Sequence, residues 1–337
     1  MRGGPDIDGP GVGGPSGGGP SGGGPSGGGP SVEGPAGQGP GVDGTKLGRL
    51  RERLEGLGSV LIAFSGGADS AFLLAAAVHA LGERRVAAAT AVSPSLPAAE
   101  LASARQFAAG LGVRHDLSRT DELSRAGYRA NGGDRCFHCK SELLDVLVPL
   151  GRRYGLAHVA TGTNADDLTA GFRPGIRAAA QRGAVTPLAD AGLTKRDVRA
   201  AARQWGLVTW DKPAAACLSS RIAYGVEVTR FRLGRVGAAE AALRAALTGA
   251  GIPVRNLRVR DLGDAARVEV DAELVPAVVE QASLLDCIQG FDSVELDRRG
   301  FRSGAMNEAL AGPGPLPLTS RQGAGVPAPA PGAGLGR

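Results

Sequence analysis

The stretch VLIAFSGGADSAFLLAA, residues 60–76, changes character abruptly at a Ser-Gly-Gly turn. Residues 60–64 before the turn form an apolar run typical of a buried strand, and residues 70–81 after it have the pattern of an apolar helix. Gly66 and Gly67 have no Cβ, so the backbone can turn sharply there and bring its N–H groups close to a ligand. The stretch therefore predicts a strand–turn–helix unit with a binding site at the turn.

An anion, and a phosphate in particular, is the ligand that such a turn favours. Backbone amides and the positive end of the helix dipole attract it, and the hydroxyls of Ser65 and Ser70 can add hydrogen bonds. The turn is neither a GxxxxGK[ST] loop, because no Lys precedes the helix, nor a GxGxxG loop. A plain turn with a capping Asp is the alternative, and the apolar strand and the two serines argue against it.

Strands and helices alternate after this stretch, which predicts an α/β fold with a doubly wound parallel sheet. Ligands then bind at the carboxyl ends of the strands. The remaining predicted strands are residues 86–92, 113–117 and 158–161, and the helices that follow them are residues 97–111, 140–154 and a segment from Thr194 to Gly206.

The chain of 337 residues divides into four predicted segments. A leader, residues 1–44, and a tail, residues 308–337, are rich in Gly and Pro and are expected to be disordered. Residues 45–225 form the first domain, and residues 226–307 form a smaller α/β domain. The elements predicted in the smaller domain are a helix at residues 231–247, strands at 257–262, 266–270 and 293–297, and a helix through Cys287.

Composition limits the partners that the protein can have. No apolar segment approaches the ~20 residues of a membrane span, and no signal peptide precedes the folded part, so we expect a soluble, cytoplasmic protein without a membrane partner. The net charge is +5, but the Arg residues are scattered among Asp and Glu, and aromatic residues make up only 4%. This balance favours an anionic small molecule over nucleic acid.

Two of the four cysteines form the motif Cys136-Phe-His-Cys139. Four cysteines are too few for a disulfide framework in a chain of this size, so the motif indicates a metal-binding or redox pair in a reducing compartment. A zinc half-site and a redox pair are its alternative interpretations. Cys217 lies between Lys212 and Arg221, and this basic setting favours its thiolate.

The motif SGGADS, residues 65–70, resembles the pyrophosphate loop of the N-type ATP pyrophosphatases, which have a HUP-like fold. In that superfamily the loop holds the phosphates of ATP while a substrate group attacks the α-phosphorus, which gives an adenylated intermediate and pyrophosphate. The resemblance implies ATP-binding residues at the strand ends; these are Ser65, Gly66, Gly67, Asp69, Ser70, Ala91, Gly162, Thr163 and Arg173.

Further motifs together resemble the LarE family, the ATP-dependent sulfur transferases that make the thiocarboxylates of the nickel-pincer nucleotide cofactor. The resemblance extends from about residue 47 to residue 307. It implies pyridinium-3,5-biscarboxylic acid mononucleotide as substrate, a homo-oligomer, and sulfide or another sulfur donor and other nickel-pincer pathway proteins as partners. The motifs are RCFHCK at 135–140, GTNADD at 162–167, RPG at 173–175, PL at 187–188, KPAAACLSSR at 212–221 and GFRSG at 300–304.

Two sulfur routes occur in that family. A carboxylate is a poor electrophile, so adenylation must activate it before sulfur attacks. In the sacrificial form, the cysteine that matches Cys217 attacks the acyl adenylate and loses its sulfur to the product. In the other form, three cysteines, here Cys136, Cys139 and Cys217, hold a [4Fe-4S] cluster with one iron free to carry sulfur.

The resemblance also assigns roles to charged residues. The implied catalytic residues are Cys217, Asp69, Asp167 and Arg221. The two carboxylates are expected near the reacting group or Mg²⁺. For Asp167, helix capping is the alternative interpretation. Surface ion pairing is the alternative interpretation for the residues that are expected to bind the substrate or a cation. These are Lys212, Arg221 and Arg258, which are expected to bind the anionic substrate, and Glu240 and Glu269, which are expected to bind a cation.

Two other functions stay open at this point. A tRNA-thiolating or ExsB-like enzyme would share the loop and a cysteine trio, although such enzymes usually carry an added RNA-binding module and the sequence has no second CxxC. A non-catalytic nucleotide-binding regulator would leave the cysteines without a purpose.

Overall fold

The computed structural model describes residues 43–171, 173–213, 216–302 and 304. The predicted leader and tail lie outside these ranges, except for the last two residues of the leader. Asp43 accepts a hydrogen bond from the Thr45 amide at 2.9 Å and caps helix α1, Gly44–Leu57, which the sequence analysis did not predict. The described structure therefore already includes residues 43 and 44 of the predicted leader.

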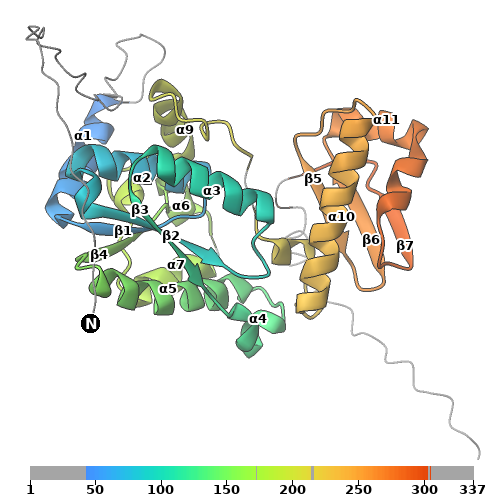
Figure 1. Cartoon of the computed structure of the whole chain (residues 1–337), viewed down its shortest axis with the longest axis horizontal. Coiled ribbons are helices and arrows are strands. Elements are labelled where there is room, and N and C mark those ends of the chain that lie inside the picture. The colour runs from blue at the N-terminus through green and yellow to red at the C-terminus, as the bar shows by residue number, and fades with distance from the viewer. Residues whose placement is uncertain (1–42, 172, 214–215, 303, 305–337) are drawn as a thin grey trace, which may run out of the picture. The chain divides into compact units, whose positions relative to one another are not determined.

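A parallel four-stranded sheet with the order β3-β2-β1-β4 forms the centre of the N-terminal part, as Figure 1 shows. Strand β1 lies between two parallel neighbours, with Val60 opposite both Val86 and His158. The predicted α/β class and parallel sheet are confirmed. The strands are β1, Val60–Ala63; β2, Val86–Val92; β3, Arg114–Arg119; and β4, His158–Thr161.

Helices cover both faces of this sheet, because successive side chains of β1 point to opposite sides. Val60 and Ile62 are buried in one apolar core, while Leu61 and Ala63 are buried in another. The first core includes residues of α1, α2, α3 and α9, and the second includes residues of α5 and α7, so the sheet is doubly wound (Figure 1). The helices are α2, Ala68–Leu81; α3, Ala98–Gly110; α4, Ala126–Arg129; α5, Arg135–Arg153; α6, Ala165–Thr169; α7, Pro174–Gln181; α8, Pro187–Asp190; and α9, Lys195–Gln204.

Helix α5 begins five residues earlier than predicted, so the Cys-x-x-Cys pair lies on a helix and not in the loop before it. The Arg135 guanidinium donates to Asn131 Oδ1 at 2.5 Å and to the Ser219 carbonyl at 2.9 Å. These bonds hold the first turn of the helix, and no local sequence pattern predicts the one to Ser219, which spans 84 positions of the chain.

A second, three-stranded sheet follows, with β5 antiparallel to β6 and β6 parallel to β7. Leu243 and Leu247 of α10 are buried in one core with Val259 and Val268 of the sheet. The predicted helix through Cys287 separates into α11 and a 3₁₀ turn. The elements are α10, Arg230–Gly249; β5, Leu257–Asp261; β6, Ala265–Val270; α11, Val275–Glu280; the 3₁₀ turn, Ala282–Cys287; and β7, Ser293–Leu296.

The segment between the two sheets is held by one buried amide. Asn131 has a φ of 55°, and its Nδ2 lies 2.8 Å from the carbonyls of Ala223 and Val226 and 3.3 Å from that of Ile222. The predicted domain boundary near residue 225 falls within this segment and stays a prediction.

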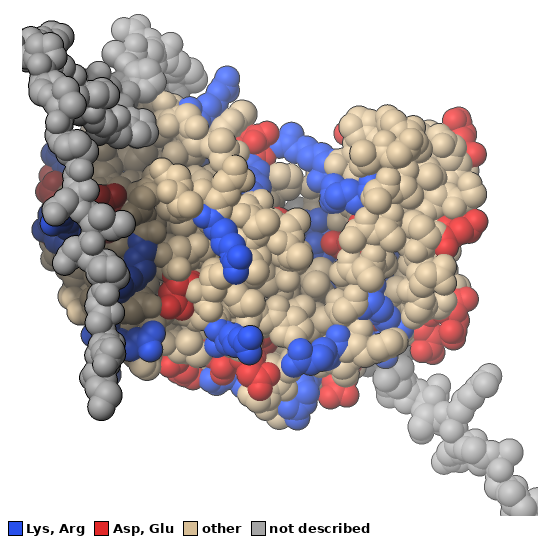
Figure 2. All heavy atoms as spheres, viewed as in Figure 1, with Lys and Arg blue, Asp and Glu red and all other residues tan. Residues whose placement is uncertain are grey.

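The surface carries charged side chains of both signs, as the scattered Arg, Asp and Glu residues of the sequence predict. Along the lower edge of the face shown in Figure 2, basic and acidic side chains alternate. Across the described ranges, every helix is too short or too polar to cross a bilayer.

Gly162 brings the end of β4 against the start of α2. A Cβ at this position would lie 2.8 Å from the Ser70 amide nitrogen and 3.0 Å from Ser70 Cα. Both obstacles are backbone atoms, so a side chain cannot be accommodated by rotating a neighbour.

We predict that Gly162→Ala lowers the free energy of unfolding by about 1–3 kcal/mol, because the extra methyl group forces the strand end and the helix apart. Urea denaturation measures this change. Gly56→Ala is the matched control, since a Cβ at Gly56 meets no atom within 4 Å in helix α1, and it should raise stability by about 0.5–1 kcal/mol. An equal response of the two variants would contradict the close contact.

Asp197 links α9 to α1, because its Oδ2 lies 2.6 Å from Lys46 Nζ. Burial acts to raise its pKa, but the bonds from Lys46 and from Thr194, which forms a capping box with it, lower the pKa to about 2. A carboxylate with a lowered folded-state pKa stabilises the protein above its unfolded pKa, and this stability is lost as the pH falls toward the folded value.

We predict that Asp197→Asn costs about 2 kcal/mol of unfolding free energy at pH 7. The difference between wild type and variant should shrink between about pH 4 and pH 2 as wild-type Asp197 becomes protonated. Denaturation curves across this range check the prediction, and a difference that stays constant with pH would refute the role of the charge.

Candidate functional site

A pocket of about 380 Å³ lies at the carboxyl ends of β1, β2 and β4, where the topology predicts a ligand. It brings together most of the predicted nucleotide-binding residues and two of the three predicted cluster cysteines. The predicted residues that line it are Ser65, Gly67, Asp69, Ser70, Ala91, Cys139, Gly162, Thr163, Asp167 and Cys217.

Hydrogen bonds within the Ser-Gly-Gly turn hold its shape. Ser70 Oγ lies 3.1 Å from Ser65 Oγ and donates to the Gly67 carbonyl at 3.1 Å, while the Gly67 amide donates to Ser65 Oγ at 3.4 Å. Gly66 adopts a φ of 71°, which glycine accepts without strain. Gly67 occupies the N-cap of α2 without a side-chain cap, so the first amides of that helix can bind an anion.

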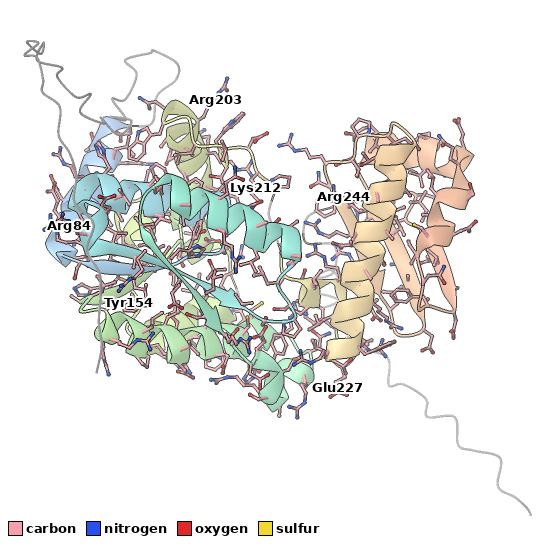
Figure 3. The ribbon with its side chains drawn as sticks, in the orientation of Figure 1. Arg84, Tyr154, Arg203, Lys212, Glu227 and Arg244 are labelled. Carbon is pink, nitrogen blue, oxygen red and sulfur yellow. The ribbon has the colours of Figure 1, made fainter. Side chains whose placement is uncertain are left out.

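Lys212 connects this turn to the segment that carries Cys217. Lys212 is labelled in Figure 3. Its Nζ donates to the Gly66 carbonyl at 3.0 Å and pairs with Glu100 Oε2 at 2.7 Å, and Glu100 also lines the pocket. Lys212 itself does not line the pocket as described. Its ammonium group therefore stabilises the Ser-Gly-Gly turn through the Gly66 carbonyl, and its predicted role in substrate binding stays a prediction.

Asp69 and Asp167 present two carboxylates to the pocket. Burial raises the pKa of Asp69 and the charge of Asp167 raises it further, while Lys195, whose Nζ lies 4.0 Å from Asp69 Oδ2, opposes them. Asp69 Oδ1 is buried and, among the described residues, has no hydrogen-bond partner. An orphaned carboxylate oxygen beside a second carboxylate fits a divalent cation such as Mg²⁺.

Asp167 also caps a helix, which was the alternative interpretation. Its Oδ2 accepts from the Asn164 amide at 3.2 Å, and its own amide donates to Asn164 Oδ1 at 3.2 Å, so the two residues form a capping box on α6. Arg173 Nη2 lies 3.8 Å from Asp167 Oδ1 but outside the pocket lining. Asp167 is thus held by its own helix while it faces the pocket.

Cys139 and Cys217 both line the pocket, whereas Cys136 is exposed one helical turn before Cys139. Burial raises the pKa of the Cys139 thiol, and the negative charges of Cys217 and Glu122 raise it further. Cys217 Sγ lies 2.9 Å from Ser219 Oγ. In the ranges that the structure describes, no three His, Cys, Asp or Glu side chains gather into a metal-binding group, so the three-cysteine cluster stays a prediction.

Glu122 and Lys140 are among the pocket residues that the sequence analysis missed. Glu122 is buried, and its carboxylate accepts from the hydroxyls of Ser93 at 2.5 Å, Ser95 at 2.7 Å and Thr120 at 3.1 Å. No local pattern marks Glu122. Lys140 could have been found, because it directly follows the cysteine pair; burial lowers its pKa, and Cys139 and Cys136 oppose that effect.

Arg221 and Glu240, predicted to bind substrate and a cation, bind each other. Arg221 Nε and Nη2 lie 2.9 and 3.1 Å from the two carboxylate oxygens of Glu240. The remaining terminal nitrogen donates to the carbonyls of Ala216 and Cys217. Arg221 is buried and outside the pocket lining, so this ion pair holds the Cys217 segment against α10.

Arg258 and Glu269 lie opposite each other on β5 and β6. Glu269 Oε2 accepts from Arg260 Nη2 at 2.6 Å. Burial and the neighbouring charges of Arg221 and Arg260 lower the pKa of Arg258 to about 10. These residues form a buried charged cluster that does not line the pocket, and their predicted roles toward phosphate and a cation stay predictions.

Comparison with curated proteins gives two relatives that match over most of their length. The chain is 42% identical over 271 residues to an uncharacterised protein of Synechocystis sp., with 79% of this chain and 98% of the relative covered. It is 35% identical over 269 residues to pyridinium-3,5-bisthiocarboxylic acid mononucleotide synthase of Lactiplantibacillus plantarum, with 79% of this chain and 95% of the relative covered.

A shorter match is 28% identical over 175 residues to an uncharacterised protein of Methanocaldococcus jannaschii, with 51% of this chain and 66% of the relative covered. No family model matches the chain.

We predict that Arg221→Lys lowers the free energy of unfolding by about 3 kcal/mol in the absence of any ligand, because lysine cannot replace the bidentate pair and the carbonyl contacts. Thermal and urea unfolding measure the loss. Arg267→Lys is the control: Arg267 pairs with Glu295 at 2.7 Å on the exposed surface, where loss of a pair costs about 0–1 kcal/mol. Similar losses in both variants would show that Arg221 does not hold the segment.

Proposed function

Because the chain belongs to the LarE family, the family of pyridinium-3,5-bisthiocarboxylic acid mononucleotide synthase, we propose that it is an ATP-dependent sulfur transferase. Its substrate is pyridinium-3,5-biscarboxylic acid mononucleotide, and it replaces a carboxylate oxygen by sulfur to give a thiocarboxylate of the nickel-pincer cofactor. The observation that carries the proposal is that the SGGADS turn and Cys217, 147 positions after Ser70 in the chain numbering, line one pocket.

ATP binding is supported by the construction of the turn. The uncapped amides at the start of α2 and the hydroxyls of Ser65 and Ser70 are donors for phosphate oxygens, and Lys212, paired with Glu100, holds the turn by its bond to the Gly66 carbonyl. Ala91 at the end of β2 lines the same pocket and is expected to contact adenosine. The triphosphate would thus be held with its α-phosphorus toward the strand ends.

Asp69 and Asp167 are the residues that would hold Mg²⁺ against the phosphates, because Asp69 Oδ1 has no protein partner among the described residues. When bound, Mg²⁺ supplies positive charge that offsets the negative charge of the phosphates. The substrate carboxylate attacks the α-phosphorus, pyrophosphate leaves, and the acyl adenylate carries AMP as a good leaving group.

Cys217 is the residue that we propose to carry the sulfur. In the sacrificial route its thiolate attacks the acyl carbon and AMP departs. The Cβ–S bond then breaks as a base removes the Cα proton, so that sulfur leaves with the product and residue 217 becomes dehydroalanine. Atoms balance, because the protein loses the elements of hydrogen sulfide.

In the other route Cys136, Cys139 and Cys217 would hold a [4Fe-4S] cluster. When bound, the cluster supplies an iron that carries exogenous sulfur to the pocket. Cysteine thiolates are the usual ligands of such a cluster, and two of the three thiols line the pocket. Cys217 is required in either route, so the two are distinguished by the fate of its sulfur.

The experiment is anaerobic purification with quantification of iron and sulfide, followed by incubation with ATP, Mg²⁺ and the dicarboxylated mononucleotide. We predict thiolated product, AMP and pyrophosphate from the wild type, and no thiolated product from Cys217→Ser. Cys287→Ser is the matched control, because Cys287 Sγ donates to the Leu284 carbonyl at 3.1 Å away from the pocket lining. It should retain the wild-type rate within about twofold, since this half-buried thiol lies outside the pocket lining.

Mass spectrometry of the protein decides the route. Loss of hydrogen sulfide at residue 217 indicates the sacrificial route, and an intact chain with thiolated product indicates the cluster. Sulfur incorporated into tRNA, with none in the mononucleotide, would overturn the proposal in favour of a tRNA-thiolating enzyme. ATP binding without any turnover would overturn it in favour of a nucleotide-binding regulator.

A further inference from the structure

Glu122 is a buried carboxylate on the wall of the pocket, and the proposed sulfur transfer gives it no role. Its Oε1 accepts from the hydroxyls of Ser93 and Ser95, and its Oε2 accepts from that of Thr120. Hydroxyls satisfy the hydrogen bonds of a carboxylate but carry no net charge. Burying a charge is costly unless an opposite charge balances it, and these partners supply none.

Three other carboxylates line the described pocket, and each of them has a basic partner. The pairs are Lys212 with Glu100 at 2.7 Å, Lys195 with Asp69 at 4.0 Å, and Arg173 with Asp167 at 3.8 Å. Glu122 differs from these three, because no basic side chain in the described ranges forms an ion pair with it and its hydrogen-bond partners are hydroxyls.

Lys140 also lines the pocket, but other acidic groups surround it. Burial lowers the pKa of Lys140, and the charges that oppose this effect are those of Cys139, Cys136 and Asp167; Glu122 is not among them. Within the described lining, therefore, Glu122 receives no counter-charge from the protein. A ligand is the remaining source of one.

Glu122 lies beside the segment that carries Cys217. The Ser95 hydroxyl donates to Glu122 at 2.7 Å, and the Ser95 carbonyl accepts from the Leu218 amide at 2.8 Å. Leu218 directly follows Cys217, which lines the same pocket. A ligand group that meets Glu122 is thus held on the part of the wall that adjoins the Cys217 segment.

We propose that Glu122 binds the positively charged ring of the substrate. The mononucleotide of the proposed reaction is a pyridinium, whose quaternary ring nitrogen carries a positive charge and has no proton to donate. Such a ring needs a nearby anion and no hydrogen-bond acceptor, which suits a carboxylate whose oxygens already accept from three hydroxyls. A ribose hydroxyl or the adenine amino group of ATP would bring a hydrogen bond but no charge.

The inference rests on the proposed function for the identity of the substrate, and it adds a determinant of specificity. Glu122 favours a dicarboxylate with a cationic ring over one with a neutral pyridine ring, because only the cationic ring balances the buried charge. It also orients the ring, since the positive charge is held beside the Cys217 segment.

Calorimetric titration of the whole protein tests the role of the charge without turnover. Glu122→Gln keeps the shape of the side chain and removes its charge, so the Kd for the dicarboxylated mononucleotide, measured with a non-hydrolysable ATP analogue present, should rise about tenfold. The Kd for the ATP analogue alone should change less than about twofold, because a neutral donor loses no charge pair.

Glu295→Gln is the matched control, since it removes the same charge from an exposed pair with Arg267. Both dissociation constants should stay within about twofold of the wild-type values, because solvent screens this distant charge. Thermal unfolding of both variants shows whether they are folded.

Two small ligands isolate the charge of the ring. N-methylpyridinium-3,5-dicarboxylate and pyridine-3,5-dicarboxylate differ by one methyl group and one positive charge. The wild type should bind the cationic compound about tenfold more tightly, and Glu122→Gln should bind the two with similar affinity. The wild-type comparison tests the inference even where the variant does not fold.

Equal affinity of the wild type for the two small ligands would overturn the inference and leave the proposed function intact. So would a folded Glu122→Gln that binds the mononucleotide as tightly as the wild type, or one that loses affinity for the ATP analogue instead. A wild type that prefers the cationic ligand but transfers no sulfur to the mononucleotide would support the recognition of charge and overturn the proposed function.

Discussion

The contact between Gly162 and the start of α2 is the constraint on which the site depends. With 2.8 Å between the Ser70 amide nitrogen and the position where a Cβ would lie, only glycine lets the end of β4 approach the first turn of that helix. This approach places Asp167, on the helix after β4, at the same pocket as Asp69 and the Ser-Gly-Gly turn. Two strand ends that are separated by about a hundred residues thus share one cavity because a side chain is absent.

The segment that carries Cys217 is held at that cavity by three kinds of interaction. Lys212 attaches its beginning to the Gly66 carbonyl, the Ser95 carbonyl accepts from the Leu218 amide, and Arg221 secures its end through Glu240. Each interaction involves a different part of the fold. The sulfur of Cys217 is therefore positioned by a buried ion pair and backbone bonds, and the cost of burying Arg221 is offset by five polar contacts within hydrogen-bond distance.

Local sequence patterns were sufficient for the main elements of the fold. Strands β2 and β4 begin and end where the apolar runs predict, and Thr194 caps α9 through the capping box that its spacing to Asp197 allows. The start of α5 was predicted five residues too late, because Arg135 is held by Asn131 and Ser219. Hydrogen bonds across 84 positions of the chain leave no signal in a window of a few residues.

The sequence by itself determined the parallel sheet, the Ser-Gly-Gly turn between strand and helix, and the set of thiols and carboxylates, because these follow from residue type and short spacing. Only the tertiary structure decided which of them meet. It brought Cys139 and Cys217 to the pocket, paired Arg221 with Glu240, and surrounded Glu122 with three hydroxyls. The physical reason is that burial and pairing of polar groups depend on segments that are distant in the chain, and the composition of any one segment does not specify its partner.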